Sequence, residues 1–120
     1  MDCPFCQSDQ LVMENDLAKA FFDKHPVNEG HLLVVPKRHT VTYFECTIEE
    51  KIAIDQLIQR GKVHLEETYQ PDGFNIGTNA GSAAGQTIFH CHIHLIPRFT
   101  GDIDDPRGGV RGVIPEKRVY

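Results

Sequence analysis

The sequence predicts an α+β fold in which a mostly antiparallel sheet carries one long helix on one of its faces. Short apolar segments typical of strands lie before and after a single long amphipathic segment, about residues 47–70. The chain has 120 residues, 40% of them hydrophobic, which suits one ordinary core. We therefore expect a single domain over residues 1–120, with a core over about 1–100 and a C-terminal tail over about 101–120.

The first part of the predicted sheet precedes the helix. Residues 11–14 and 18–22 are predicted to form two short strands joined at Asn15-Asp16, residue types that favour tight turns. Residues 30–37 contain a continuous run of leucine and valine bounded by glycine and proline, as expected of a strand buried on both faces. These segments predict a hairpin followed by a central strand.

The long helix is predicted to begin at a capping box. In Thr47-Ile48-Glu49-Glu50 the threonine accepts a hydrogen bond from the backbone three residues on, and Glu50 reaches back. The apolar residues that recur at helical spacing are expected to face the sheet: Ile48, Ile52, Leu57, Ile58, Gly61, Leu65 and Tyr69. Glu49, Glu50, Gln56, Gln59, Glu66 and Glu67 are expected on the solvent face. Because glycine costs up to about 1 kcal/mol relative to alanine in a helix, Gly61 suggests a close approach to the sheet.

Two more strands are predicted after the helix, at 74–78 and 88–96, with a loop between them. Glycine in this loop lets the backbone approach a ligand, and Asn79, Gln86 and Thr87 can donate to phosphate oxygens. The loop alone could equally be a flexible turn. Its position directly before a histidine-rich strand favours a binding loop.

That last strand contains His90, His92 and His94 at every second position, with apolar residues between them. In a strand, this spacing places three imidazoles in one row. Histidine titrates near neutrality, so the row can supply a nucleophile, an acid or base, and a metal ligand. A chance cluster on a polar strand face is the alternative interpretation.

Cys3 and Cys6 form a Cys-x-x-Cys pair, whereas Cys46 and Cys91 stand apart. Disulfides would need an oxidising compartment, and a redox pair normally follows a strand, for which the N-terminus leaves no room. Metal binding is the interpretation we favour. The pair supplies half of a tetrahedral zinc site, and with seven histidines in the chain we expect histidines to complete it.

Charge and hydropathy limit the classes of partner. The net charge of −5 argues against broad binding to a nucleic-acid backbone, although small phosphorylated ligands need only a local group of donors. The sequence has no long apolar run and no charged start followed by a hydrophobic segment. We expect a cytoplasmic protein that binds neither membranes nor nucleic-acid polymers.

The segment 90–96, His-Cys-His-Ile-His-Leu-Ile, resembles the signature of the histidine triad (HIT) family of nucleotide hydrolases and transferases. Gly85-Gln86-Thr87 lies at the family's usual offset before it. Phe22-Asp23 and residues 30–39 are similar to the family's nucleoside-binding and conserved-histidine segment, so the resemblance spans nearly the whole chain. It implies a HIT-like fold with a five-stranded sheet, one long helix and a short N-terminal segment.

The resemblance also implies roles for individual residues. His92 is expected to attack the α-phosphate and form a nucleotidyl-histidine intermediate, with His31 orienting it through a backbone carbonyl or a direct contact. Asp23 is expected to accept from the ribose hydroxyls. The expected donors to phosphate are His94, Asn79, Gln86, Thr87 and the backbone around Gly85. The expected neighbours of the base are Phe5, Phe22 and Leu32.

In zinc-containing members of the superfamily a Cys-x-x-Cys pair joins two histidines, which here would be His39 and His90. Cys3, Cys6, His39 and His90 would close a tetrahedron around one structural zinc per chain, and no catalytic metal is expected. The alternative is free thiols, with His90 as a hydrogen-bonding member of the triad.

Histidine at position 94, where uridylyltransferases carry glutamine, implies hydrolysis. Leu95-Ile96-Pro97-Arg98 resembles the dinucleoside polyphosphate branch; an adenosine phosphoramidase, or a nucleotide-binding and signalling protein with weak catalysis, is the alternative. In the tail, Arg107 and Arg111 could bind distal phosphates, or the tail could be solvated or packed at a dimer interface. Family members generally form homodimers, and we expect the same here.

Overall fold

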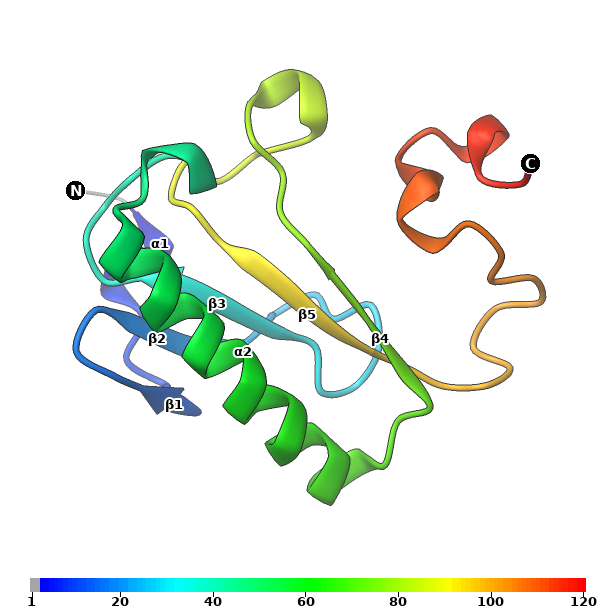
Figure 1. The fold of residues 1–120 in the computed structure, drawn as a ribbon, viewed down its shortest axis with the longest axis horizontal. Helices are drawn as coiled ribbons and strands as arrows, with labels where there is room; N and C mark the ends of the chain where they lie inside the picture. Colours follow the sequence, from blue (N-terminus) through cyan, green and yellow to red (C-terminus); the bar gives the residue numbers. More distant parts are fainter. Residues whose placement is uncertain (1–2) are drawn as a thin grey trace.

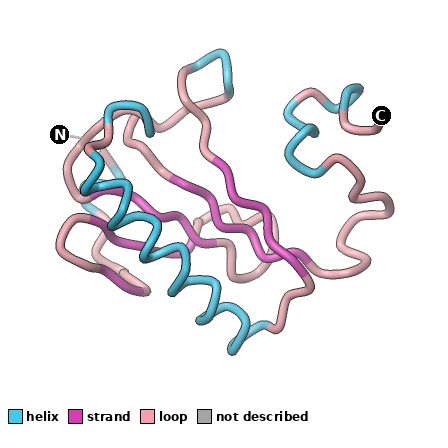
Figure 2. The backbone as a smooth tube through the Cα atoms, in the orientation of Figure 1, coloured by secondary structure: helices cyan, strands magenta, loops and turns pink. Residues whose placement is uncertain are grey.

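The structure, a computed structural model, describes residues 3–120 and contains a five-stranded antiparallel sheet with one long helix on one face (Figure 1). The strands are β1 (Met13–Glu14), β2 (Ala18–Phe22), β3 (Leu32–Pro36), β4 (Gly73–Gly77) and β5 (Ile93–Arg98), in the spatial order β1-β2-β3-β5-β4. The helices are α1 (Pro4–Gln7) and α2 (Ile48–Tyr69). Short 3-10 turns lie in the loops: η1 (Tyr43–Glu45), η2 (Ser82–Ala84), η3 (Gly109–Val113) and η4 (Pro115–Lys117) (Figure 2). The predicted fold class is confirmed.

The hairpin and the central strand follow the prediction closely. The bounds of β2 are those expected, and β2 pairs with all of β3, from Phe22 opposite Leu32 to Ala18 opposite Pro36. The first strand is shorter than predicted. Only Met13 and Glu14 pair with β2 in the ladder, although the backbone N–H of Val12 also donates to the carbonyl of Ala20 (2.8 Å).

Helix α2 begins at the predicted capping box. Thr47 Oγ1 accepts from the Glu50 N–H (3.0 Å), and the Glu50 carboxylate accepts from the Thr47 N–H (2.8 Å). At the other end, Gln70 adopts a left-handed conformation with φ 54°. Its N–H donates to the carbonyls of Leu65 and Glu66, so the last turn is also closed.

The predicted division of the faces of α2 was wrong for three residues. Ile48 and Ile52 are 70% and 54% exposed, because they lie about half a turn away from the buried stripe that runs through Ala53, Leu57 and Gly61. Glu50, expected in solvent, is only 4% exposed. Its charge is compensated there by Arg38, which donates to both carboxylate oxygens at 2.9 and 2.8 Å.

Gly61 marks the predicted close approach of α2 to the sheet. A Cβ atom at this position would lie 3.1 Å from Leu32 Cδ1 and 3.2 Å from Leu95 Cδ2, both on fully buried side chains. These two leucines and Leu65 form one of the buried clusters between helix and sheet. The missing side chain is therefore what lets helix and sheet come so close.

The last strand begins later than predicted. Ladder pairing starts at Ile93, opposite Val34, so only His94 of the three histidines lies in β5. The same register would bring His92 opposite Val35 and then Cys91 opposite Pro36, which has no N–H to donate. The chain turns away there, and the Cys91 N–H donates to the carbonyl of Thr40 (2.7 Å) instead.

The side chains nevertheless keep the predicted alternation. Cys91 and Ile93 pack under α2 with Ala18, Ala20 and Val34. The opposite face of the sheet is covered by the N-terminal segment, where Cys3 and Phe5 pack on Phe21, Leu33 and Val35. The histidines lie on this second face.

The C-terminal tail lies beyond β4 and apart from α2 (Figure 1). Its side chains bond mainly within the tail: Arg107 pairs with Asp105 (3.0 Å), and the Arg118 guanidinium donates to the carbonyls of Asp105 and Arg107. No helix in residues 3–120 is long and apolar enough to cross a membrane.

Candidate active site and metal centre

Three histidines and one aspartate meet on the face of the sheet that α2 leaves uncovered. His31 immediately precedes β3, and its Nε2 lies 2.9 Å from Nδ1 of His94 in β5. The rings of His92 and His94 follow, with centroids 5.2 Å apart. Asp23 Oδ2 lies 3.5 Å from His31 Nε2. These predicted site residues are thus adjacent, but His31, which was expected to orient His92, bonds to His94.

Hydrogen bonding fixes the tautomer of His92. Its Nδ1 lies 2.8 Å from the carbonyl oxygen of His90. A carbonyl can only accept, so Nδ1 carries the proton and Nε2 of the neutral ring keeps its lone pair. The carbonyl of His92 itself accepts from Thr78 Oγ1 (2.7 Å). His92 is 8% exposed, so both its ring and its backbone are held in place while Nε2 retains a nucleophilic electron pair.

The same reasoning extends to His31 and His94. The backbone N–H of Val27 donates to His31 Nδ1 (3.0 Å), so neutral His31 carries its proton on Nε2 and donates it to His94 Nδ1. His94 must then carry its own proton on Nε2. Burial lowers the pKa of His31, outweighing the opposing effect of Asp23. Burial, followed by His92 and His31, lowers the pKa of His94 to about 4. His94 is therefore a neutral N–H donor at neutral pH.

Ligand atoms of Asp23, His31 and His94 lie within 4.8 Å of one another, a spacing that would also suit a metal ion. The tautomers argue against one. A metal on His31 Nε2 would have to replace the proton that this atom carries while Nδ1 accepts from Val27. This group is better described as a chain of hydrogen bonds from His31 to His94, with Asp23 beside it.

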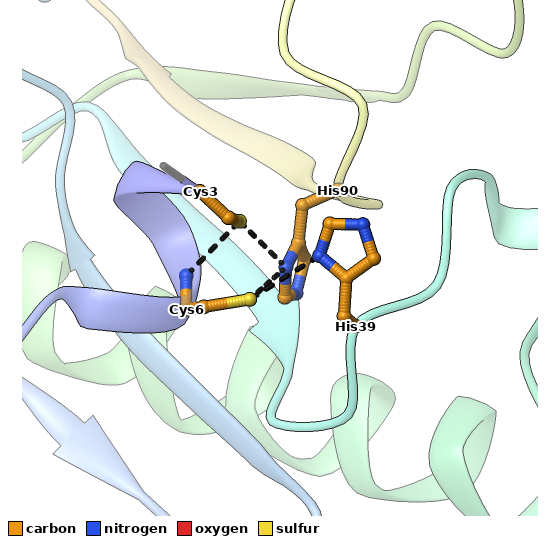
Figure 3. Close-up of side chains that lie close together, drawn as sticks. All are labelled: Cys3, Cys6, His39 and His90. Carbon is orange, nitrogen blue, oxygen red and sulfur yellow. Dashed lines mark hydrogen bonds between the residues drawn. The ribbon is translucent and has the colours of Figure 1, made fainter. Parts of the chain in front are cut away.

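A second cluster joins Cys3, Cys6, His39 and His90, and Figure 3 shows the two sulfur atoms and two rings converging. His90 Nδ1 lies 3.3 Å from each sulfur, and His39 Nδ1 lies 3.2 Å from Cys6 Sγ. Tetrahedral zinc, with bonds of about 2.3 Å to sulfur and about 2.0 Å to nitrogen, holds neighbouring ligand atoms at roughly such separations. The four predicted ligands come together in an arrangement that could hold a metal ion.

The orientation of His90 supports this fit. His90 is fully buried, and its Nε2 lies 2.8 Å from the carbonyl of Pro36, to which it donates. Nδ1 is therefore the unprotonated nitrogen, and its lone pair faces the two sulfurs. Metal-binding histidines commonly donate their second nitrogen to a carbonyl in this way, which fixes the ring.

The loop expected to bind phosphate is shaped by Gln86. Its amide donates to the carbonyls of Val41 (2.7 Å) and Ile88 (3.1 Å) and accepts from the Gly81 N–H (2.8 Å). Both amide hydrogens are used and the residue is 3% exposed, so Gln86 has no side-chain hydrogen left to donate to a phosphate, contrary to the prediction. Thr87 is exposed and Asn79 half-buried, with Gly85 at φ 95° between them.

The expected neighbours of the base are not equally placed. Leu32 is completely buried under α2, on the face away from the histidines, so its predicted contact with the base was wrong. Phe22, at the end of β2, is 42% exposed. Phe5 packs edge-on against His92 with centroids 4.9 Å apart. Asp23 accepts from the His25 N–H (2.9 Å) and flanks His31.

Two contributors to the site were not predicted. Thr78 anchors the backbone of His92, and Arg38 holds the segment that carries His39 by pairing with buried Glu50 and donating to the Glu45 carbonyl (3.1 Å). The sequence offered a signal for Arg38, because its partner Glu50 lies one helical turn before Ala53 and Ile54, two apolar residues that α2 buries. Thr78 had none, since its role depends on the pairing of β4 with β5.

Comparison with known proteins gives consistent results. The family model described as HIT domain matches residues 6–101. A HIT-like protein of Mycoplasma genitalium is 37% identical over 103 residues, covering 81% of this chain and 73% of that protein. An adenylylsulfatase of Arabidopsis thaliana is 36% identical and an AP-4-A phosphorylase of Mycobacterium tuberculosis 33% identical, each over 107 residues. These matches cover 84% and 82% of this chain but 54% and 55% of those proteins.

Solved structures agree with the fold. A HIT family protein from Bacillus anthracis superposes with a TM-score of 0.79 at 36% identity, covering 84% of this chain and 76% of that one. A Zn-bound histidine triad family protein from Mycobacterium smegmatis superposes with a TM-score of 0.76 at 34% identity, covering 84% and 78%.

Proposed function

The chain belongs to the HIT family, and from this premise we propose that it is a nucleotide hydrolase that cleaves at the α-phosphate of a dinucleoside polyphosphate or a related nucleotide. The observation that carries the proposal is the tautomer of His92, whose Nδ1 donates to the His90 carbonyl and whose Nε2 keeps its lone pair. A neutral, positioned imidazole is a good nucleophile at neutral pH.

In the first step, His92 Nε2 attacks the α-phosphorus. The P–N bond forms while the P–O bond to the leaving phosphate or polyphosphate breaks, and the leaving oxygen retains the bonding electrons. The Nε2–H of His94 donates to the oxygen on which charge accumulates, and the backbone around Gly85, with Asn79 and Thr87, supplies further donors. His31 holds His94 in the donating tautomer.

In the second step, water attacks the phosphorus of the nucleotidyl-histidine. The P–N bond breaks, its electrons return to Nε2, and the proton lost by the attacking water passes to solvent or to the phosphate released in the first step. Asp23 is proposed to accept from the ribose hydroxyls, with Phe22, which is 42% exposed, beside the base. Splitting one difficult displacement into two easier ones is the advantage of the covalent route.

Two relatives that are named for an activity support a substrate with an adenylyl group. One is named an adenylylsulfatase and the other an AP-4-A phosphorylase, so the group transferred is common to both names while the leaving group and the acceptor differ. The second candidate is therefore a related reaction at the same phosphorus, with an adenosine phosphoramidate or adenylyl sulfate as substrate. A nucleotide-binding protein with weak catalysis is the remaining alternative.

We further propose that Cys3, Cys6, His39 and His90 hold one structural zinc per chain. Four protein ligands leave no open position, so the ion would tie the N-terminal segment to the sheet and take no direct part in catalysis. The Zn-bound relative from Mycobacterium smegmatis supports this proposal.

The expected homodimer also remains a proposal. Strand β4 lies at one edge of the sheet, and Ile76 on it is 51% exposed. An open edge strand with an exposed apolar side chain is a surface that a second copy can cover. Light scattering coupled to size-exclusion chromatography tests this directly: a monomer mass at every concentration would contradict it.

The activity is tested with a panel of diadenosine tetraphosphate, adenylyl sulfate and adenosine phosphoramidate, each with and without inorganic phosphate as an alternative acceptor. We expect turnover of at least one substrate by the wild type and its loss in His92→Asn. His64→Asn, at a half-buried position of α2, is the matched control and should keep full activity. No turnover by the wild type, or undiminished turnover by His92→Asn, would refute the enzyme proposal.

The zinc proposal is tested by elemental analysis of protein purified without added metal. We expect about one zinc per chain in the wild type and a loss of zinc in Cys3→Ser. Protein that contains only traces of zinc, and whose unfolding is unchanged by Cys3→Ser, would refute the site. Cys46→Ser, on the face covered by α2, is the matched control that should retain the metal.

A further inference from the structure

A buried lysine lies directly behind the cysteine pair. Lys19 stands in the middle of β2 and is only 7% exposed. Its neighbours Ala18 and Ala20 face α2, so by the alternation of a strand Lys19 faces the N-terminal segment, on the same side as Phe21. Its neighbours on this side of the sheet, Phe21 along β2 and Val35 opposite it on β3, are apolar. A lysine whose aliphatic stem is buried usually extends its ammonium group into water.

The ammonium group instead meets the end of α1. Nζ of Lys19 lies 3.4 Å from the carbonyl oxygen of Cys6 and 3.3 Å from that of Ser8. The last carbonyls of a helix have no partner within it, and a cation at this end is favourable. The other end of the same turn is closed by Cys3, whose sulfur accepts from the Cys6 N–H (3.2 Å).

Helix α1 needs such support because it is a single turn of four residues. A turn this short is not stable on its own, so its shape depends on the contacts around it. That shape sets the separation of Cys3 Sγ and Cys6 Sγ, which must both reach His90 Nδ1, at 3.3 Å from each. Moving the Cys6 carbonyl would move a metal ligand.

Burying the charge also has a cost that its hydrogen bonds only partly offset. A buried ammonium is unfavourable unless it is paired, and its two partners here are neutral carbonyls. Sulfur binds zinc as thiolate, so a metal centre formed at Cys6 places negatively charged atoms near this cation. The charge of Lys19 is better compensated when the cluster is assembled.

We propose that Lys19 is a positioning residue of the metal centre, which clamps the Cys-x-x-Cys turn through the carbonyls of Cys6 and Ser8 and thereby raises its affinity for zinc. The inference rests on the proposed zinc site. It adds a residue outside the four ligands, on a strand that contributes none of them.

The test measures zinc affinity directly, without any assay of activity. Metal-free protein competes with a chromophoric chelator for zinc, and unfolding in urea is measured with excess zinc and with excess chelator. Lys19→Met keeps the length of the side chain but removes the charge and the donor. We expect its zinc dissociation constant to rise about tenfold or more, the usual cost of losing an outer partner of a metal site.

Two control variants separate this role from a merely structural one. Lys37→Met makes the same chemical change just after the end of β3, where the ammonium group pairs with Glu14 (2.8 Å) and not with the cysteine turn. Its zinc dissociation constant should stay within about twofold of the wild-type value. Val35 lies directly opposite Lys19 on β3, on the same face of the sheet. Val35→Ala removes apolar volume there, and it should lower the free energy of unfolding with a smaller effect on the affinity for zinc. If Lys19→Met does not fold, Lys19→Gln takes its place, with the same expected direction.

The outcomes are distinct. Zinc bound equally well by the Lys19 variant and the wild type would overturn this inference and leave the zinc site standing. A loss in Val35→Ala as large as that in the Lys19 variant would also overturn it, because any damage to the layer would then suffice. No zinc binding by the wild type would overturn the zinc site and this inference together.

Discussion

The ring of Phe5 meets the imidazole of His92 edge-on, with centroids 4.9 Å apart and planes at 70°. Phe5 stands between the two cysteines of the metal cluster, and it also packs on Phe21 at 5.4 Å. The N-terminal turn therefore touches the proposed nucleophile directly. This contact is a second link from the cluster to His92, beside the bond from His92 to the His90 carbonyl.

Replacing Phe5 should consequently affect the chemical step more than substrate binding. Phe5→Leu keeps most of the apolar volume but loses the edge-on contact, so we expect kcat to fall several-fold while KM changes little. Phe5→Ala should in addition lower the free energy of unfolding by about 3 kcal/mol. Steady-state kinetics with the active substrate distinguish the two parameters. A rise in KM at constant kcat would instead place Phe5 in the base pocket.

Breaking the Arg38–Glu50 pair should destabilise the fold. Glu50 is buried and accepts from Arg38 and from the helix cap, and Arg38 holds the pKa of its carboxyl below the ordinary value. Because Arg38 is 53% exposed, we expect Glu50→Gln to cost about 1–2 kcal/mol rather than the full cost of a completely buried pair. Urea unfolding of Glu50→Gln, of a matching Arg38→Gln variant and of the double variant measures the coupling energy between the two side chains. Strictly additive effects would show that the pair contributes nothing of its own.

Filling the space at Gly61 should destabilise the protein, although alanine is the better helix former. The new methyl group would lie 3.1 Å from Leu32 and 3.2 Å from Leu95, which are too deeply buried to move aside. We expect Gly61→Ala to cost about 1 kcal/mol and Gly61→Val about 3 kcal/mol, since overpacking outweighs propensity. Thermal unfolding of both variants provides the measurement. A stabilised Gly61→Ala would mean that helix and sheet are less tightly packed than they appear.

Protonation of His94 should contribute to the loss of stability at low pH. Its pKa in the folded protein is about 4, against an ordinary value of 6.5. As pH falls through this window, the unfolded chain takes up a proton that the folded protein does not, so the free energy of unfolding falls. Between about pH 7 and about pH 4.5 the wild type should lose on the order of 2 kcal/mol more than His94→Gln. Equal losses would show that His94 is not desolvated.

The sequence was sufficient for the sheet, the long helix and the Cys-x-x-Cys pair, because these depend on local patterns and on short motifs. His39 and His90 were identified as ligands only through the family resemblance. The capping box at Thr47 and the glycine at position 61 each had a definite structural meaning. The two faces of α2 were harder. Ile48 and Ile52 are apolar but exposed, and Glu50 is charged but buried through a partner twelve residues away.

The site was predictable in its members but not in its connections. Alternation placed the histidines on one face, yet the strand register at Pro36 decides that His90 and His92 lie outside β5. The bond of His31 to His94, the use of Gln86 within its own loop and the clamp by Lys19 all depend on tertiary contacts. Sequence spacing carries no information about such contacts.

The central claim, that Nε2 of His92 becomes covalently bound to phosphorus, is tested most directly by trapping the intermediate. Wild-type protein is mixed with diadenosine tetraphosphate, or with whichever substrate the activity panel identifies, quenched, and digested for peptide mass spectrometry under conditions that preserve P–N bonds. The account predicts a nucleoside monophosphate adduct on His92 in the peptide that spans residues 88–96, and its absence in His92→Asn. Turnover without any adduct on this peptide, or an adduct on another residue, would contradict it.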